Sequence, residues 1–149
     1  MKRRLLLTGP IGCGKSTLIA NALGGAIRHA GGFLTLRVIE HGRLAGFDLA
    51  PACGGPRERF LSFGEGGAVR DERPFAVTAP ALLKEAQKKK FAVLDEIGGF
   101  ELLCPDFYEA LTRFFFSGTP CVGVLKALPS AEELTRRVDL PPEYLEAAS

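Results

Sequence analysis

Residues 3–16 read RRLLLTGPIGCGKS, and this stretch decides the fold class. Its first half is a short apolar run that ends at a glycine, a pattern typical of a buried strand. Its second half, Gly9 to Ser16, matches G-x-x-x-x-G-K-[ST] at every position. Glycines in such a loop let backbone N–H groups turn towards an anion, which a Cβ would obstruct. We therefore expect a strand, a phosphate-binding loop and a helix in succession.

The last positions of the motif supply a charge and a metal ligand. Lys15 would place a positive charge on the β- and γ-phosphates of a nucleotide, and the Ser16 hydroxyl would bind Mg²⁺. The helix that follows directs the positive end of its dipole at the same phosphates. The nucleotide-binding residues predicted for this segment are Gly9, Pro10, Ile11, Gly12, Cys13, Gly14, Lys15, Ser16 and Thr17.

A nucleotide bound with Mg²⁺ needs a second acidic anchor on a neighbouring strand. Residues 91–96 read FAVLDE, an apolar run that ends in Asp95 and Glu96. We predict that Asp95 binds the metal together with Ser16, and that Glu96 orients a water molecule against the γ-phosphate. Both carboxylates join the predicted nucleotide site, with Glu96 and Lys15 as its catalytic residues.

The remaining segments alternate between strand and helix patterns. Residues 31–50 predict a β-hairpin that turns at His41 and Gly42, and residues 51–74 predict loops with a short edge strand at 59–63. Helices are expected over 15–23, over 79–88 after a Thr78 cap, over 105–116 and from Ser130 to about 138, and a further strand over 121–126. The pattern predicts an α/β fold with a mostly parallel sheet and an inserted β-hairpin.

The composition limits the class of protein. The chain has 149 residues, of which 46% are hydrophobic and 24% charged, and this fits one domain over residues 1–149. A net charge of +2 does not indicate a dedicated nucleic-acid binder, and the apolar run 5–7 is too short for an export signal or a membrane span. The four cysteines have neither zinc spacing nor a disulfide pattern. We expect a cytoplasmic protein whose partner is a nucleoside triphosphate, with no membrane association.

Three segments together resemble a known family: GPIGCGKST (9–17), GGFLTLRVIEHGRLAGF (31–47) and VLDEIGGFELLCPDFYEAL (93–111). They are similar to successive blocks of the cancer-related/thermophilic nucleoside-triphosphatase family. The family signature D-E-I-G-x-x-E falls here on Asp95, Glu96, Ile97, Gly98 and Glu101. The resemblance implies a three-layer, RecA-like P-loop core and Mg²⁺-dependent hydrolysis of ATP, GTP and other nucleoside triphosphates to the diphosphate and phosphate.

The sequence differs from that family in two places. The family usually has an acidic residue in the first strand of the hairpin, where this chain has Leu36 and Arg37. After residue 126 the chain also reaches the segment TRRVDLPPEYLEA (135–147) early, as though one strand were missing. The missing strand would affect the edge that receives the base, whereas the phosphate site is not involved.

From the residues alone, two other functions stay open. A small P-loop kinase would use the arginine-rich stretch 57–73 as a lid, and a non-catalytic nucleotide-binding module would regulate a partner without hydrolysis. Glu101 is either a support for the site or an ordinary acid before a helix. An arginine that stabilises charge in the transition state would come from the hairpin or the loops after it. The candidates are Arg37, Arg43, Arg57, Arg59, Arg70 and Arg73.

Overall fold

The structure is a computed structural model that describes residues 4–8, 15–97, 100–125, 134 and 143–146. Its strands are β1 (Arg4–Thr8), β2 (Gly31–Glu40), β3 (Arg43–Pro51), β4 (Glu58–Gly64), β5 (Gly67–Arg70), β6 (Ala92–Ile97), β7 (Cys121–Leu125) and β8 (Glu143–Glu146). Its α-helices are α1 (Lys15–Leu23), α2 (Ala79–Ala86) and α3 (Pro105–Ser117), and shorter helical turns are η1 (Gly24–His29), η2 (Pro74–Thr78) and η3 (Phe100–Leu103).

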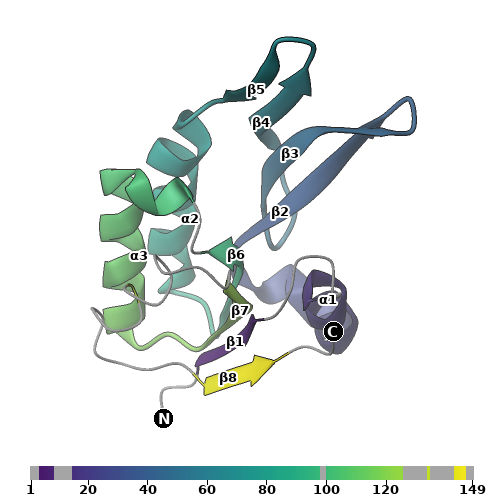
Figure 1. The fold of residues 1–149 in the computed structure, drawn as a ribbon. Coiled ribbons are helices and arrows are strands. Elements are labelled where there is room, and N and C mark those ends of the chain that lie inside the picture. The colour runs from purple at the N-terminus through teal and green to yellow at the C-terminus, as the bar shows by residue number, and fades with distance from the viewer. Residues whose placement is uncertain (1–3, 9–14, 98–99, 126–133, 135–142, 147–149) are drawn as a thin grey trace.

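The eight strands of the described residues form one sheet in the order β5-β4-β3-β2-β6-β7-β1-β8. The pairs from β2 through β6, β7 and β1 to β8 are all parallel, whereas the pairs from β2 to β5 are antiparallel. α1 covers one face of the sheet, and α2 and α3 cover the other (Figure 1). These three layers confirm the predicted α/β class with a mostly parallel sheet.

β2 and β3 form the predicted hairpin, which extends beyond the parallel strands as part of an antiparallel arm, β2–β5 (Figure 1). His41 and Gly42 form its turn with φ of 52° and 73°, the left-handed values that a tight two-residue turn needs. At its start β2 passes close to β6, because a Cβ at Gly32 would lie 2.0 Å from the carbonyl oxygen of Val93. Gly32 also has φ of +86°, so this position requires glycine.

β4 and β5 continue the arm as a second antiparallel hairpin. The sequence predicted a short edge strand at 59–63 with loops around it, so β4 was expected in part and β5 was missed. All four residues of β5 are exposed. A fully exposed strand needs no apolar face, so its sequence need not show the alternation of apolar and polar residues that marks a half-buried strand.

The helix predicted over 79–88 begins at Ala79 as expected and ends two residues sooner. α2 ends at Ala86, and the π turn η2 leads into it from Pro74. The predicted Thr78 cap was wrong: Thr78 has helical φ and ψ of −71° and −50°, and its side chain makes no capping hydrogen bond. Because the chain is already helical before Ala79, the N–H groups of the first turn of α2 are not the unbonded groups that a cap would satisfy.

The predicted helix over 105–116 is α3, which ends at Ser117 with Gly118 in the left-handed conformation at φ 78°. Beyond residue 126 the sequence predicted no strand, and this was wrong, because β8 pairs in parallel with β1 at the edge of the sheet. The helix expected from Ser130 to about 138 lies outside the described residues, apart from Leu134, which is helical and buried. In the part of the chain that the structure describes, no helix is both long and apolar enough to span a membrane.

Phenylalanine rings fill the core between the sheet and the layer of α2 and α3. Phe75 of η2 lies at the centre, with ring centroids 6.2 Å from Phe33, 4.9 Å from Phe60 and 5.2 Å from Phe107. All three contacts are edge-to-face, the favourable geometry for aromatic pairs. This cluster joins the arm, through Phe60 of β4, to the parallel strands and to α3.

A buried cation lies at the first residue of β1. Arg4 is opposite Cys121 of β7, and its guanidinium carbon lies 5.5 Å from the ring centroid of Phe115 in α3. Burial lowers the pKa of Arg4, and it raises the pKa of the Cys121 thiol to about 12 although the neighbouring charge of Arg4 acts the other way. Cys53, Cys104 and Cys121 are free thiols, and Cys13 lies outside the described residues.

Candidate active site

The candidate site lies at the edge of the sheet where β1, β7 and β6 end. These three strands run parallel, so their carboxyl ends meet at one edge, and β7 separates β1 from β6. Ligands of open α/β sheets bind outside this edge. Residues 9–14, the glycine-rich part of the predicted loop, lie outside the described residues, and the chain resumes at Lys15, the first residue of α1.

α1 is fixed against the strands that carry the site. Its buried Ile19 packs with Val93 of β6 and Val124 of β7 in the apolar cluster on this face. Val93 lies two residues before Asp95 in β6, and Lys15 lies one helical turn before Ile19. Lys15, Ser16 and Thr17 therefore form the first turn of a helix that is packed on the strand of Asp95, and the structure describes their backbone but not their side chains.

Asp95 is a buried carboxylate near the end of β6, with 4% of its surface exposed. Its Oδ2 atom accepts two hydrogen bonds from Thr35 of β2, one from the backbone N–H at 3.1 Å and one from the hydroxyl at 3.3 Å. Bonds from two donors offset part of the cost of burying the charge. Sequence analysis missed Thr35, because nothing in the alternating segment of β2 distinguishes this threonine from an ordinary strand residue.

Two further acids follow Asp95. Glu96 is the next residue of β6, and the structure describes its backbone but not its side chain. Glu101 lies in η3, and only 3% of its surface is exposed. Such burial is unusual for an acid that merely precedes a helix.

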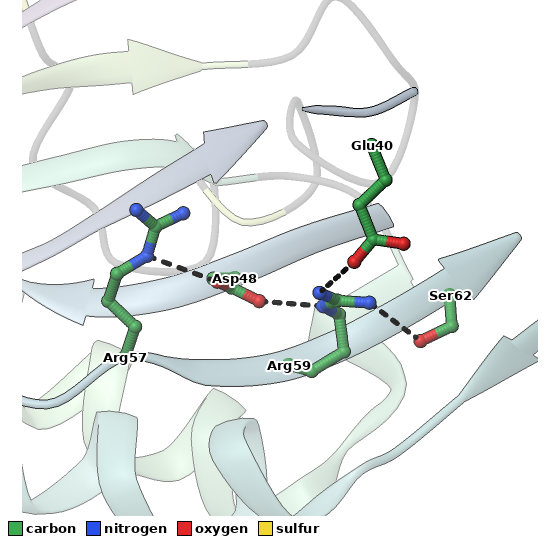
Figure 2. Close-up of polar contacts among 5 residues, drawn as sticks. All are labelled: Glu40, Asp48, Arg57, Arg59 and Ser62. Carbon is green, nitrogen blue, oxygen red and sulfur yellow. Dashed lines mark hydrogen bonds and ion pairs between the residues drawn. The ribbon is translucent and has the colours of Figure 1, made fainter. Parts of the chain in front are cut away.

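Two of the candidate arginines are bound within the arm. Figure 2 shows Asp48 between Arg57 and Arg59, whose Nε atoms donate to its two carboxylate oxygens at 3.0 and 2.8 Å. Arg59 also donates to the Ser62 hydroxyl at 3.3 Å and lies 4.0 Å from the Glu40 carboxylate. Both guanidinium groups therefore have anionic partners inside the arm, where they hold β3, β4 and the end of β2 together.

The remaining candidate arginines lie on exposed parts of the same arm and after it. Arg37 and Arg43 are exposed on the β2–β3 hairpin, Arg70 is exposed on β5, and Arg73 is exposed just before η2. The stretch 57–73, considered above as a kinase lid, contains the strands β4 and β5 of the antiparallel arm. Within the described residues no three His, Cys, Asp or Glu side chains gather as a metal cluster.

A family model described as NTPase matches residues 4–141. The chain belongs to this NTPase family. The human cancer-related nucleoside-triphosphatase is 32% identical over 165 aligned positions, which cover 94% of this chain and 86% of the human protein. Nucleoside-triphosphatase THEP1 of Thermotoga sp. (strain RQ2) is 29% identical over 154 positions, which cover 92% of this chain and 83% of that protein. The family resemblance expected from the sequence is thus confirmed.

Solved structures agree with this NTPase assignment. The solution structure of a human cancer-related nucleoside triphosphatase matches with a TM-score of 0.78 and 27% identity, over 99% of this chain and 89% of that chain. The crystal structure of THEP1 from Aquifex aeolicus matches with a TM-score of 0.72 and 24% identity, over 97% and 89% of the two chains, and supports the fold. The α/β fold predicted from the sequence agrees with both structures, and the predicted NTPase activity agrees with the family match and the human relative.

For this NTPase, the described part of the candidate site is therefore Asp95 with its partner Thr35 and the backbone of the first turn of α1. These elements come from three separate stretches of the chain, β6, β2 and α1. The candidate site combines a buried acid with the first turn of a helix, whose dipole favours anions. It suits a ligand that carries both phosphate groups and a divalent cation.

Proposed function

We propose that this NTPase is a Mg²⁺-dependent phosphohydrolase that converts nucleoside triphosphates, ATP and GTP among them, to the diphosphate and phosphate. The observation that carries the proposal is Asp95, a buried carboxylate held by Thr35 on β6, which β7 separates from β1. The G-x-x-x-x-G-K-S motif begins directly after β1. A phosphate-binding motif and a buried acid on the next strand but one supply the two halves of a metal–nucleotide site.

The residues present fit Mg²⁺. This ion takes oxygen ligands and is commonly held by one or two carboxylates together with substrate phosphates, so Asp95 and the Ser16 hydroxyl are a sufficient protein contribution. One oxygen of Asp95 is already fixed by Thr35, which keeps the carboxylate in place for a ligand. When bound, Mg²⁺ would neutralise charge on the β- and γ-phosphate oxygens.

The side chains of the motif divide the remaining work. Lys15 and the backbone N–H groups of residues 9 and 11–14 would bind the phosphates, at the end of a helix whose dipole favours anions. Glu96 would accept a proton from the attacking water and orient it towards the γ-phosphate. The other residues of the predicted loop, Pro10, Ile11, Cys13 and Thr17, would line the phosphates through their backbone.

Weak discrimination among bases is part of the proposal. The chain lacks an N-K-x-D motif for reading guanine, because Lys126 after the last core strand has no aspartate at the required position. We expect the four common triphosphates to differ by less than about tenfold, or 1.4 kcal/mol. One domain over residues 1–149 and a cytoplasmic location complete the proposed description.

Steady-state release of phosphate from ATP, GTP, CTP and UTP, with Mg²⁺ and with a chelator, tests the activity. Lys15→Ala should lose tight triphosphate binding, whereas Lys88→Ala, on an exposed lysine after α2, should bind as the wild type does. Unchanged affinity in Lys15→Ala would refute the phosphate site.

Two carboxamide variants separate the roles of the acids. Glu96→Gln should keep nucleotide affinity and lose about 10²-fold in turnover, the usual contribution of a positioned base. Asp95→Asn should also weaken the response to Mg²⁺, since its role is metal binding. The matched control is Glu109→Gln on the exposed face of α3, which should leave both quantities unchanged. If Glu96→Gln turned over as fast as the wild type, Glu96 would not be the general base, and Glu101 would be the next carboxylate to test.

A further inference from the structure

Thr35 and Asp95 lie 60 positions apart in the sequence, yet their hydrogen bonds join the arm to the candidate site. Both donors of Thr35, its N–H at 3.1 Å and its hydroxyl at 3.3 Å, meet the same oxygen, Oδ2 of Asp95. Thr35 itself is half-buried, and Asp95 is buried. Water therefore competes poorly for this oxygen, and the pair of bonds persists.

The path of β2 explains why Thr35 reaches Asp95. β2 pairs with β6 through Gly31, Gly32 and Phe33, and the ladder stops there. β2 then continues beside β3 alone, so the Thr35 N–H bonds to the side chain of Asp95 instead of to a carbonyl of β6. Gly32, where an added Cβ would lie 2.0 Å from the carbonyl oxygen of Val93, lies three residues before Thr35 in the same strand.

The torsion that rotates an aspartate carboxylate is broad, so an unrestrained carboxylate samples many orientations. Two donors on a single oxygen select one orientation, since rotation about the Cβ–Cγ bond would carry Oδ2 away from both. Partners of this kind orient metal-binding carboxylates and raise metal affinity. The Thr35 contribution is of this kind, because its hydroxyl is bonded to the ligand residue.

We propose that Thr35 is a positioning residue that fixes the orientation of Asp95 and thereby strengthens divalent-cation binding. This inference rests on the proposed function, in which Asp95 is a metal ligand. Of the two hydrogen bonds, a substitution can remove only the one from the hydroxyl, because the Thr35 N–H remains in every variant except proline. A purely structural tie would behave differently: its loss would lower stability and leave metal affinity unchanged.

The test measures binding of Mn²⁺ to the full chain by the electron paramagnetic resonance signal of free Mn²⁺. Protein is kept in excess over a non-hydrolysable ATP analogue, so that free nucleotide does not take up the metal. Thr35→Val keeps the branched shape and removes the hydroxyl, and we expect Mn²⁺ affinity to fall about tenfold, the lower end for loss of a partner to a ligand. Thr35→Ser, which keeps the hydroxyl, should bind Mn²⁺ as tightly as the wild type. If Thr35→Val does not fold, Thr35→Ala takes its place.

Thr112→Val is the matched control. The Thr112 hydroxyl donates to the Tyr108 carbonyl at 2.8 Å within α3, so this variant loses a threonine hydrogen bond away from the site. It should lower stability without changing Mn²⁺ affinity. In an Asp95→Asn background, Thr35→Val should add no further loss of affinity, because the effect acts through the carboxylate.

The outcomes separate the two proposals. Suppose that the wild type binds Mn²⁺ together with the ATP analogue and also hydrolyses nucleoside triphosphates. If Thr35→Val and Thr35→Ala then bind Mn²⁺ as the wild type does, the positioning role is refuted and the proposed function stands. If Thr35→Val weakens Mn²⁺ binding equally in the Asp95→Asn background, the role is also refuted, since the effect does not pass through Asp95. If the wild type shows no Mn²⁺ binding and no hydrolysis, the proposed metal site fails and the role of Thr35 fails with it.

Discussion

Replacing Gly32 by alanine should destabilise this NTPase far more than an ordinary glycine substitution. The new Cβ would lie 2.0 Å from the carbonyl oxygen of Val93, and β2 would have to retreat until the distance reaches the 3.4 Å of ordinary contact. The φ of +86° adds a backbone cost of about 1–2 kcal/mol for a residue with a Cβ. The forced displacement of a packed strand adds about 1–3 kcal/mol.

Together these terms give a loss of about 2–5 kcal/mol in the free energy of unfolding, or about 6–16 °C in Tm for a chain of this size. Urea and thermal unfolding followed by circular dichroism measure it. Gly42→Ala is the matched control, because Gly42 has φ of +73° but nothing within 4 Å of its Cβ position, so only the backbone cost applies. Equal losses in the two variants would show that the close approach of β2 to β6 does not constrain residue 32.

Three further outcomes are expected. Phe75→Ala should lose about 3–5 kcal/mol of stability in urea unfolding, because three rings pack against Phe75, whereas Phe116→Ala, at an exposed ring, should lose little. Burial raises the pKa of the Cys121 thiol to about 12 from 9.0, so between these pH values the folded chain retains a proton that the unfolded chain releases. The free energy of unfolding should therefore fall as the pH rises from about 9 towards 12, and it should fall less steeply in Cys121→Ala. Asp48→Asn should lower the free energy of unfolding by about 1 kcal/mol, and by more at low salt than at high salt. The control Glu109→Gln, which removes an exposed ion pair within a helix, should lower it by almost nothing. An Asp48 effect that does not depend on salt would contradict the ion-pair explanation.

Local patterns predicted most of the core of this fold. The apolar run that ends in Asp95 and Glu96 is strand β6, and the turn at His41 and Gly42 is present with left-handed φ at both residues. These features depend on neighbours in the sequence, since strand burial and turn conformation leave their marks within a few residues. The family signature D-E-I-G-x-x-E also predicted the NTPase family, and the match of the family model to residues 4–141 confirmed it.

The missed features depend on contacts between distant segments. Thr35 acquires its role because β2 leaves β6 at the level of Asp95, 60 positions away in the sequence. β5 is exposed along its length and exists through pairing with β4. The Thr78 cap failed for a similar reason, because the packing of Phe75 in the core begins the helical path at Pro74 before any capping position.

The position of β1 in the sheet sets an order of assembly. Both of its neighbours, β7 and β8, come from residues 121–146, whereas the strands of the arm pair with neighbours that are close in the sequence. Chains emerge from the ribosome N-terminus first, and long-range pairing is slow because distant segments must meet. β1 thus leaves the ribosome long before both of its partners, and it can pair only after translation has passed β7. The nucleotide site that we propose after β1 would then form only once the sheet is complete around β1.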